Sequence, residues 1–128
     1  MVNDVISDFI TRIRNASIVR HKIVKTPATK ITIAIAKILK IEGFIDDFEK
    51  FENSLLIFLK YKNQNTYSTI NSLKRISKPG RRVYLKKKNL PKRIGSFGVS
   101  ILSTSNGIIS DKMARLANIG GEVLIYIY

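Results

Sequence analysis

The sequence predicts an α+β fold made of two small, packed α/β subdomains whose strands are mostly antiparallel. Hydrophobic residues make up 45% of the 128 residues, which is enough to build a core. Segments with helical periodicity alternate with short apolar segments and turn signals, as in other α+β proteins. Residues 1–72 carry eleven Lys or Arg against seven Asp or Glu, a net +4, whereas residues 73–128 carry twelve against two, a net +10. We therefore expect one unit over residues 1–68 and a more basic unit over 69–128.

Two helices are predicted in the first unit. The second covers residues 30–42, where the isoleucines alternate as in a strand but fit one face of a helix equally well. We favour a helix because thirteen residues is long for a strand, Thr29 can cap its start and Gly43 can follow its end. In the first helix, Asn3 or Asp4 can serve as the N-cap, and apolar residues recur at the spacing of one face: Ile6, Phe9, Ile10 and Ile13.

The other segments of the first unit are predicted as strands, a turn and a linker. Residues 21–26 alternate weakly in hydrophobicity, and residues 44–45 open a short strand. The acidic and polar residues 46–53 indicate a turn, and the apolar run 55–59 indicates a buried strand. The polar residues 62–69 are the most linker-like stretch, which places the boundary near residue 68.

The second unit is predicted to contain several short strands and one short helix. Residues 70–76 flank a strand or edge segment, Pro79 and Gly80 indicate a type II turn, and three further strands follow at 83–85, 99–102 and 123–128. Residues 103–107 form a polar loop before the helix. We expect Ser110 or Asp111 to cap that helix and Gly120-Gly121 to end it. Its inward face is expected to carry Met113, Leu116 and Ala117.

The composition excludes several functions. The chain has no cysteine, so disulfides, thiolate metal sites and thiol catalysis are excluded. No apolar run is long enough for a membrane helix, and the N-terminus resembles neither a signal nor a transit peptide. The single histidine, His21, has no nucleophile nearby in sequence, and Asp46, Asp47 and Glu49 indicate a solvated turn better than a cation site. We therefore expect no enzymatic activity, cofactor, metal, membrane or small-molecule substrate.

The strongest positive signal is a basic segment at residues 74–93, which holds ten Lys or Arg and no acid. Such a run repels itself, but it suits a partner whose phosphates release condensed counterions on binding. A solvated, solubilising surface is the alternative. Tyr84 can stack on a base or pack in the core. The basic residues that we expect to contact RNA are Arg81, Arg82, Lys86 and Lys87.

A second candidate is the uncharged, hydroxyl-rich segment Ser103, Thr104, Ser105, Asn106 and Gly107. Each hydroxyl can donate and accept a hydrogen bond, and small side chains let a partner approach the backbone closely. Taken alone this signal is weak. Asn106-Gly107 is also a common tight-hairpin pair, so a purely structural role stays open.

Five segments in order resemble the S8 family of universal small-subunit ribosomal proteins. The match extends along nearly the whole chain, and the last two segments are the most specific. The segments are residues 4–15, 27–45, 77–84, 103–111 and 120–124.

The resemblance implies two small α+β domains that bind the central domain of small-subunit ribosomal RNA, beside neighbouring ribosomal proteins. By this resemblance, the segment that enters an irregular RNA core consists of Ser103, Thr104 and Ser105, and Glu122 supports that segment. The first unit is expected to contact the minor groove and backbone of the RNA. Its matching residues are Asp4, Thr11, Arg14, Asn15, Thr29 and Lys30.

Residues 27–30 resemble the cyanobacterial and plastid branch of the family, although Ala28 stands where relatives often have serine. We therefore expect a plastid ribosome, with the bacterial cytoplasm as the alternative. The rival function is that of a basic protein that docks on acidic protein surfaces.

Overall fold

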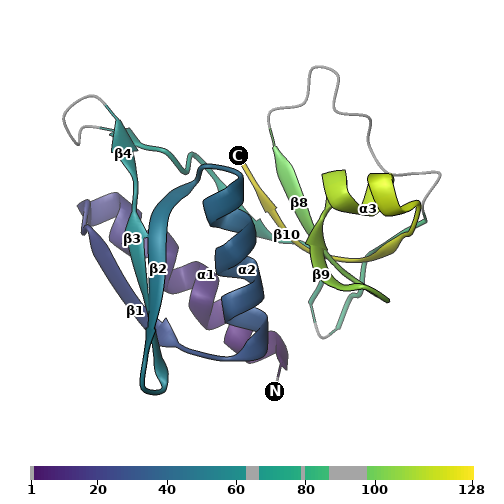
Figure 1. The fold of residues 1–128 in the computed structure, drawn as a ribbon, viewed down its shortest axis with the longest axis horizontal. Coiled ribbons are helices and arrows are strands. Elements are labelled where there is room, and N and C mark those ends of the chain that lie inside the picture. The colour runs from purple at the N-terminus through teal and green to yellow at the C-terminus, as the bar shows by residue number, and fades with distance from the viewer. Residues whose placement is uncertain (1, 63–66, 79, 87–97) are drawn as a thin grey trace. The chain divides into compact units, whose positions relative to one another are not determined.

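The computed structural model describes residues 2–62, 67–78, 80–86 and 98–128, except for the side chains of residues 2–4 and 67. These residues form helices and antiparallel sheets, which confirms the predicted α+β class (Figure 1). The chain divides into two compact units, Met1–Asn71 and Ser72–Tyr128. Sequence analysis placed a boundary near residue 68, and the separate binding roles of the two units stay a prediction.

Unit 1 consists of a three-stranded antiparallel sheet, two helices and a separate two-stranded sheet. The sheet has the order β1-β3-β2, so β3 is its central strand. Leu55, Ile57 and Leu59 alternate along β3 and are almost completely buried, as the apolar run predicted. The elements of the sheet and its helices are α1 (Val2–Val19), β1 (Ile23–Pro27), α2 (Lys30–Ile41), β2 (Ile45–Phe51) and β3 (Ser54–Leu59).

The ambiguous segment after Thr29 is a helix, as predicted. Thr29 and Thr32 form a capping box: the Thr29 hydroxyl accepts from the Thr32 amide at 3.1 Å, and the Thr29 amide donates to the Thr32 hydroxyl at 2.8 Å. Ile35 and Leu39, one turn apart, are fully buried. Gly43 follows the helix with φ +82°, the left-handed conformation that glycine adopts readily.

Two predictions in unit 1 were wrong. Residues 46–51 belong to strand β2, and only Glu52 and Asn53 form the turn to β3, with φ +57° at Glu52. Strand β2 is an edge strand, which can carry acidic side chains towards solvent on one side. Part of the expected linker is also strand, since β4 (Tyr61–Lys62) pairs with β5 (Tyr67–Ser68).

Unit 2 is built around a central strand, β10. The sheet order is β6-β10-β8-β9, and β7 also pairs with β10. Leu102, Val123 and the helical Ala114 form a buried cluster, to which helix α3 contributes from one face of the sheet. Its elements are β6 (Leu73–Arg75), β7 (Tyr84–Leu85), β8 (Val99–Thr104), β9 (Gly107–Ser110), α3 (Asp111–Ala117) and β10 (Gly121–Ile127).

The predicted inward face of α3 was wrong. Ala114 is fully buried, whereas Met113 is 53% and Leu116 is 74% exposed, and Ala117 is also exposed. The Ser110 hydroxyl accepts from the Met113 amide at 3.2 Å and so fixes where this short helix begins. Because the helix begins at this point, its inward side carries the small Ala114, which lies against the sheet.

The predicted end of α3 was also wrong. The helix ends at Ala117, and the C-cap Asn118 takes the left-handed conformation with φ +59°. Gly121 instead belongs to β10, where a β-carbon would lie 2.3 Å from the Ser103 carbonyl oxygen. Glycine at this position therefore allows close approach of β10 to β8.

No helix in the described part of the chain is long and apolar enough to cross a membrane.

Candidate nucleic-acid interface

The sheet register of unit 2 brings three predicted site residues into one row. Tyr84 on β7 pairs with Glu122 on β10, and Glu122 pairs with Ser103 on β8. Paired residues of antiparallel strands project to the same face, and their chain neighbours Leu102 and Val123 belong to the buried cluster on the other face. Tyr84 is 68% exposed, which excludes the alternative that it packs in the core. The row therefore presents an aromatic ring, a carboxylate and a hydroxyl together.

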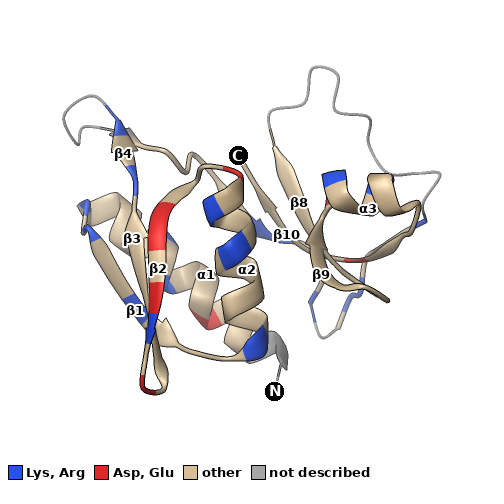
Figure 2. Ribbon diagram, in the orientation of Figure 1, with Lys and Arg blue, Asp and Glu red and all other residues tan. Residues whose placement is uncertain are grey.

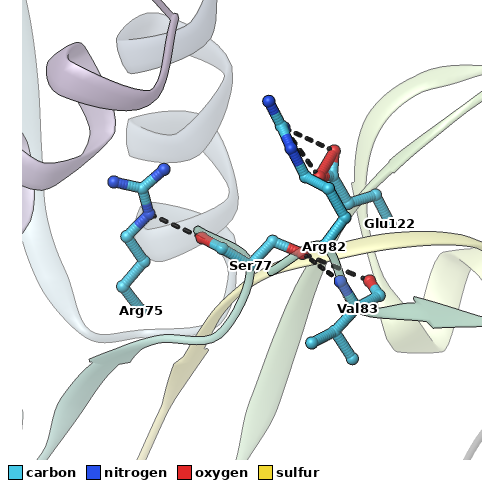
Figure 3. Close-up of polar contacts among 5 residues, drawn as sticks. All are labelled: Arg75, Ser77, Arg82, Val83 and Glu122. Atoms are coloured by element: carbon cyan, nitrogen blue, oxygen red, sulfur yellow. Dashed lines mark hydrogen bonds and ion pairs between the residues drawn. The ribbon is translucent and has the colours of Figure 1, made fainter. Parts of the chain in front are cut away.

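An ion pair holds Glu122 in this row. The Arg82 guanidinium donates to the two Glu122 carboxylate oxygens, at 3.0 and 3.4 Å (Figure 3). The Glu122 side chain is 15% exposed and that of Arg82 is 41% exposed. The pair compensates a largely buried carboxylate, and it leaves the guanidinium partly open to an anionic partner.

The segment that carries Arg82 is held by a buried serine that the sequence analysis missed. Ser77 is 1% exposed, and its hydroxyl accepts from the Val83 amide at 2.9 Å and donates to the Val83 carbonyl at 3.2 Å (Figure 3). Between them, the backbones of Lys78 and Arg81 exchange hydrogen bonds of 2.8 and 3.0 Å. We call these Ser77–Val83 hydrogen bonds the clasp, and a hydroxyl residue two positions before a Pro-Gly pair is the signal that could have indicated it. The predicted turn type depends on Pro79, which lies outside the described residues.

The hydroxyl-rich segment is a hairpin rather than a five-residue loop. Ser103 and Thr104 belong to β8, Gly107 begins β9, and the two turn residues are Ser105 and Asn106. The turn is therefore one residue earlier than the Asn-Gly pair suggested. Gly107 directly follows the turn and has φ +94°, which favours glycine there.

The three hydroxyls of residues 103–105, in and next to the turn of this hairpin, differ in their hydrogen bonding. The Thr104 hydroxyl donates to the Gly107 carbonyl at 2.9 Å and accepts from the Asn106 amide at 3.1 Å, so it stabilises the turn. The hydroxyls of Ser103 and Ser105 make no hydrogen bond to the part of the chain that the structure describes. Ser105 is exposed and Ser103 half-buried. These two hydroxyls are the ones available to a partner.

Several basic residues lie near this row. Arg81, Arg82 and Lys86 are exposed, while Lys87 lies outside the described residues. Figure 2 shows how Lys and Arg are distributed on the ribbon. From residue 73 onward the sequence has twelve Lys or Arg but only two acids, Asp111 and Glu122. The positive charge of this unit is therefore largely uncompensated.

In unit 1, three predicted residues share one exposed face of α1. Thr11, Arg14 and Asn15 are exposed and follow one another at helical spacing, and Asp4 lies two turns earlier in the same helix. Lys30 is exposed at the start of α2. Thr29 differs, since both its hydroxyl and its amide are engaged in the capping box.

The acidic residues of unit 1 form no metal site within the described ranges. Asp47 instead accepts a 2.9 Å ion-pair contact from Lys40. Hydrogen bonds from the Lys40 ammonium and from the Phe48 amide lower the pKa of the Asp47 carboxyl. His21 is exposed, as expected for a surface histidine.

Comparisons with known proteins match nearly the whole chain to a single family. A family model described as Ribosomal protein S8 matches residues 4–128. A protein of Trichodesmium erythraeum named small ribosomal subunit protein uS8 is 52% identical over 130 residues, covering 98% of each chain. Proteins named small ribosomal subunit protein uS8c are 49% identical in Pyropia yezoensis, covering 100% of this chain and 99% of that one, and 47% identical in Guillardia theta, covering 100% of both.

Proposed function

The chain belongs to the ribosomal protein S8 family, and from this premise we propose that it is a primary binding protein for the central domain of small-subunit ribosomal RNA. It is a structural protein of the small ribosomal subunit, not an enzyme, and it associates there with ribosomal RNA and other ribosomal proteins. In the proposed role it also helps to assemble the platform of the subunit.

One observation carries the proposal: the row of Tyr84, Glu122 and Ser103 on a single sheet face, on which the Tyr84 ring is exposed and the other two side chains are partly exposed. A flat tyrosine ring is a stacking surface for an unpaired base. A carboxylate can accept hydrogen bonds from base amino groups, and a hydroxyl can bond to a base edge or a ribose 2′-hydroxyl. The combination suits an irregular RNA shape better than a uniform duplex.

We assign affinity and specificity to different residues of unit 2. Arg81, Arg82 and Lys86 provide phosphate contacts, which raise affinity for any RNA. The two available hydroxyls, of Ser103 and Ser105, provide specificity for one RNA over others. Glu122 disfavours phosphates placed directly over the row, and this too favours a base at that position.

Unit 1 provides a second set of contacts in this proposal. Thr11, Arg14 and Asn15 on α1, together with Lys30 on α2, face the backbone and minor groove of the RNA. Thr29 contributes indirectly, because its hydroxyl stabilises the helix start that presents Lys30. We further propose that the protein works in a plastid ribosome, with a bacterial ribosome as the alternative.

Footprinting of the full chain on a small-subunit RNA transcript tests the function. We expect protection confined to one irregular stem of the central domain, and weaker protection there with Glu122→Gln. The rival function, docking on an acidic protein surface, predicts equal competition by any RNA of matched length. Competition by the isolated stem at near-physiological salt, against an unrelated duplex, distinguishes the two.

A further inference from the structure

A cleft lies where α1 meets strand β1, and Asn15 is the one predicted RNA-contact residue among the residues that line it. Its volume is about 380 Å³, which falls within the range of ligand pockets. Ala16 and Val24 are buried at this junction, whereas Val19 is 60% and Ile23 is 52% exposed. The polar residues that line it are Arg12, Asn15, His21 and Lys25. The cleft thus combines exposed apolar surface with positive charge.

Several contacts fix the shape of this cleft. The His21 amide donates to the Ala16 carbonyl at 3.0 Å, five residues back, which closes the C-terminus of α1. The His21 carbonyl in turn accepts from the Tyr61 hydroxyl. The Arg12 guanidinium donates to the Lys25 carbonyl at 2.9 Å and pairs with Asp8, so it joins α1 to β1.

Arg20 is the residue that closes the helix, and it has φ +61°. Glycine is the usual residue in this left-handed position, and a side chain with a β-carbon is strained there. Here the position holds an exposed cation, next to the exposed His21 and Lys22. Arg20 is not itself a lining residue, but it stands between two residues that are, Val19 and His21, so it adds a positive charge next to the cleft.

We propose that this cleft is a second RNA-binding site, which takes one unpaired nucleotide. The base lies against Val19 and Ile23, and its phosphate lies near His21 and Lys25. The inference rests on the proposed binding to small-subunit RNA, and it adds a site apart from the sheet face of unit 2.

Charge favours RNA over a peptide as the occupant. Strand β1 is an edge strand, so one side of its backbone is unpaired within the sheet and could accept a peptide strand. Two cations, Arg12 and Lys25, line the cleft and no acid does. Arg12 already pairs with Asp8, whereas the Lys25 ammonium pairs with no acid in the described part of the chain. A phosphodiester supplies the missing negative charge, and a nucleobase can bond to the open backbone edge as well as fill the apolar part.

A matched pair of double variants tests the proposal. The test variant is Ile23→Ser with Lys25→Ala on β1, and the control is Lys50→Ala with Phe51→Ser on the opposite edge strand, β2. Each removes one exposed cation and one exposed apolar side chain. For the full chain on a small-subunit RNA transcript, we expect the test variant to bind about tenfold more weakly, with a salt slope smaller by about one. The control should stay within about twofold of the unchanged chain.

Arg20→Gly provides a variant whose folding is not at risk. It removes one cation at a φ that glycine prefers, so we expect undiminished thermal stability and RNA binding about threefold weaker. A benzophenone amino acid in place of Val19 locates the partner. We expect it to cross-link to the RNA, with the reverse-transcription stop at an unpaired nucleotide.

Three results would overturn the proposal: equal binding by the test and control variants, undiminished RNA binding by Arg20→Gly, or a cross-link to a paired nucleotide. Failure of the proposed function looks different. In that case the unchanged chain would bind the transcript no more tightly than an unrelated RNA.

Discussion

Ser105→Ala should separate RNA recognition from folding. Ser105 is exposed at the tip of the β8–β9 hairpin, and its hydroxyl makes no hydrogen bond to the described residues. Because no internal bond is lost, we expect the free energy of unfolding to change by less than about 0.5 kcal/mol. A hydrogen bond buried against RNA contributes about 1–2 kcal/mol, so affinity for the cognate stem should fall about five- to thirtyfold.

Thr104→Val at the neighbouring position is the matched comparison. Valine keeps the β-branched shape, but it loses the bonds of 2.9 Å to Gly107 and 3.1 Å to Asn106. At about 0.5–1 kcal/mol each in this exposed turn, the loss of stability should be about 1–2 kcal/mol. Thr104→Val should therefore act mainly on unfolding, and Ser105→Ala mainly on RNA binding.

Urea denaturation measures the first quantity, and filter binding to the cognate stem and to an unrelated duplex measures the second. Asn53→Ala, an exposed change at the hairpin turn of unit 1, should leave both quantities unchanged. The reasoning fails if Ser105→Ala weakens binding to both RNAs equally, or if it destabilises the fold as much as Thr104→Val does.

Three further predictions concern charge, the clasp and acid stability. Lys86→Ala should lower the salt slope of RNA binding by about one unit or less, whereas the control Lys37→Ala should leave the slope unchanged. An unchanged slope for Lys86→Ala would show that Lys86 does not contact RNA. Ser77→Ala leaves the half-buried Val83 amide without its partner, whereas the Val83 carbonyl still accepts from the Val123 amide, and the change should cost about 1–3 kcal/mol in urea denaturation; a loss below about 0.5 kcal/mol would contradict the clasp. The pKa of Asp47 is lowered in the folded state by its hydrogen bond from Lys40, so this contribution to stability is present above the unfolded pKa near 3.8 and disappears as pH falls through the folded value. Asp47→Asn should therefore lower the free energy of unfolding at neutral pH but not at pH 2. A loss of stability that is the same at both pH values would contradict this role of the Lys40–Asp47 pair.

Elements with strong local signals were predicted well. The helix after Thr29 has a capping residue and a glycine at its two ends, and the apolar run at 55–59 alternates about a buried face. Strand β2 was missed because its acidic side chains resemble a turn when read alone. Only its pairing with β3 identifies it as an edge strand.

The phase of α3 could not be predicted for a related reason. Met113 and Leu116 are apolar, so hydrophobicity alone turns them inward. The Ser110 cap and the close sheet beneath instead place Ala114 inside and expose both larger side chains. In seven residues a hydrophobic pattern is too short to outweigh a cap and a steric limit.

The sequence by itself determined the family, the α+β class, the excess of positive charge after residue 72 and most of the residues proposed to meet RNA. These follow from local patterns and residue chemistry, which need no partner across the fold. Only the tertiary structure decided that Tyr84, Glu122 and Ser103 form one row, that Thr104 is engaged while Ser105 is available, and that an open cleft lined by Arg12 and Lys25 lies between α1 and β1. Such arrangements depend on strand register and on contacts between residues far apart in sequence, which no local pattern encodes.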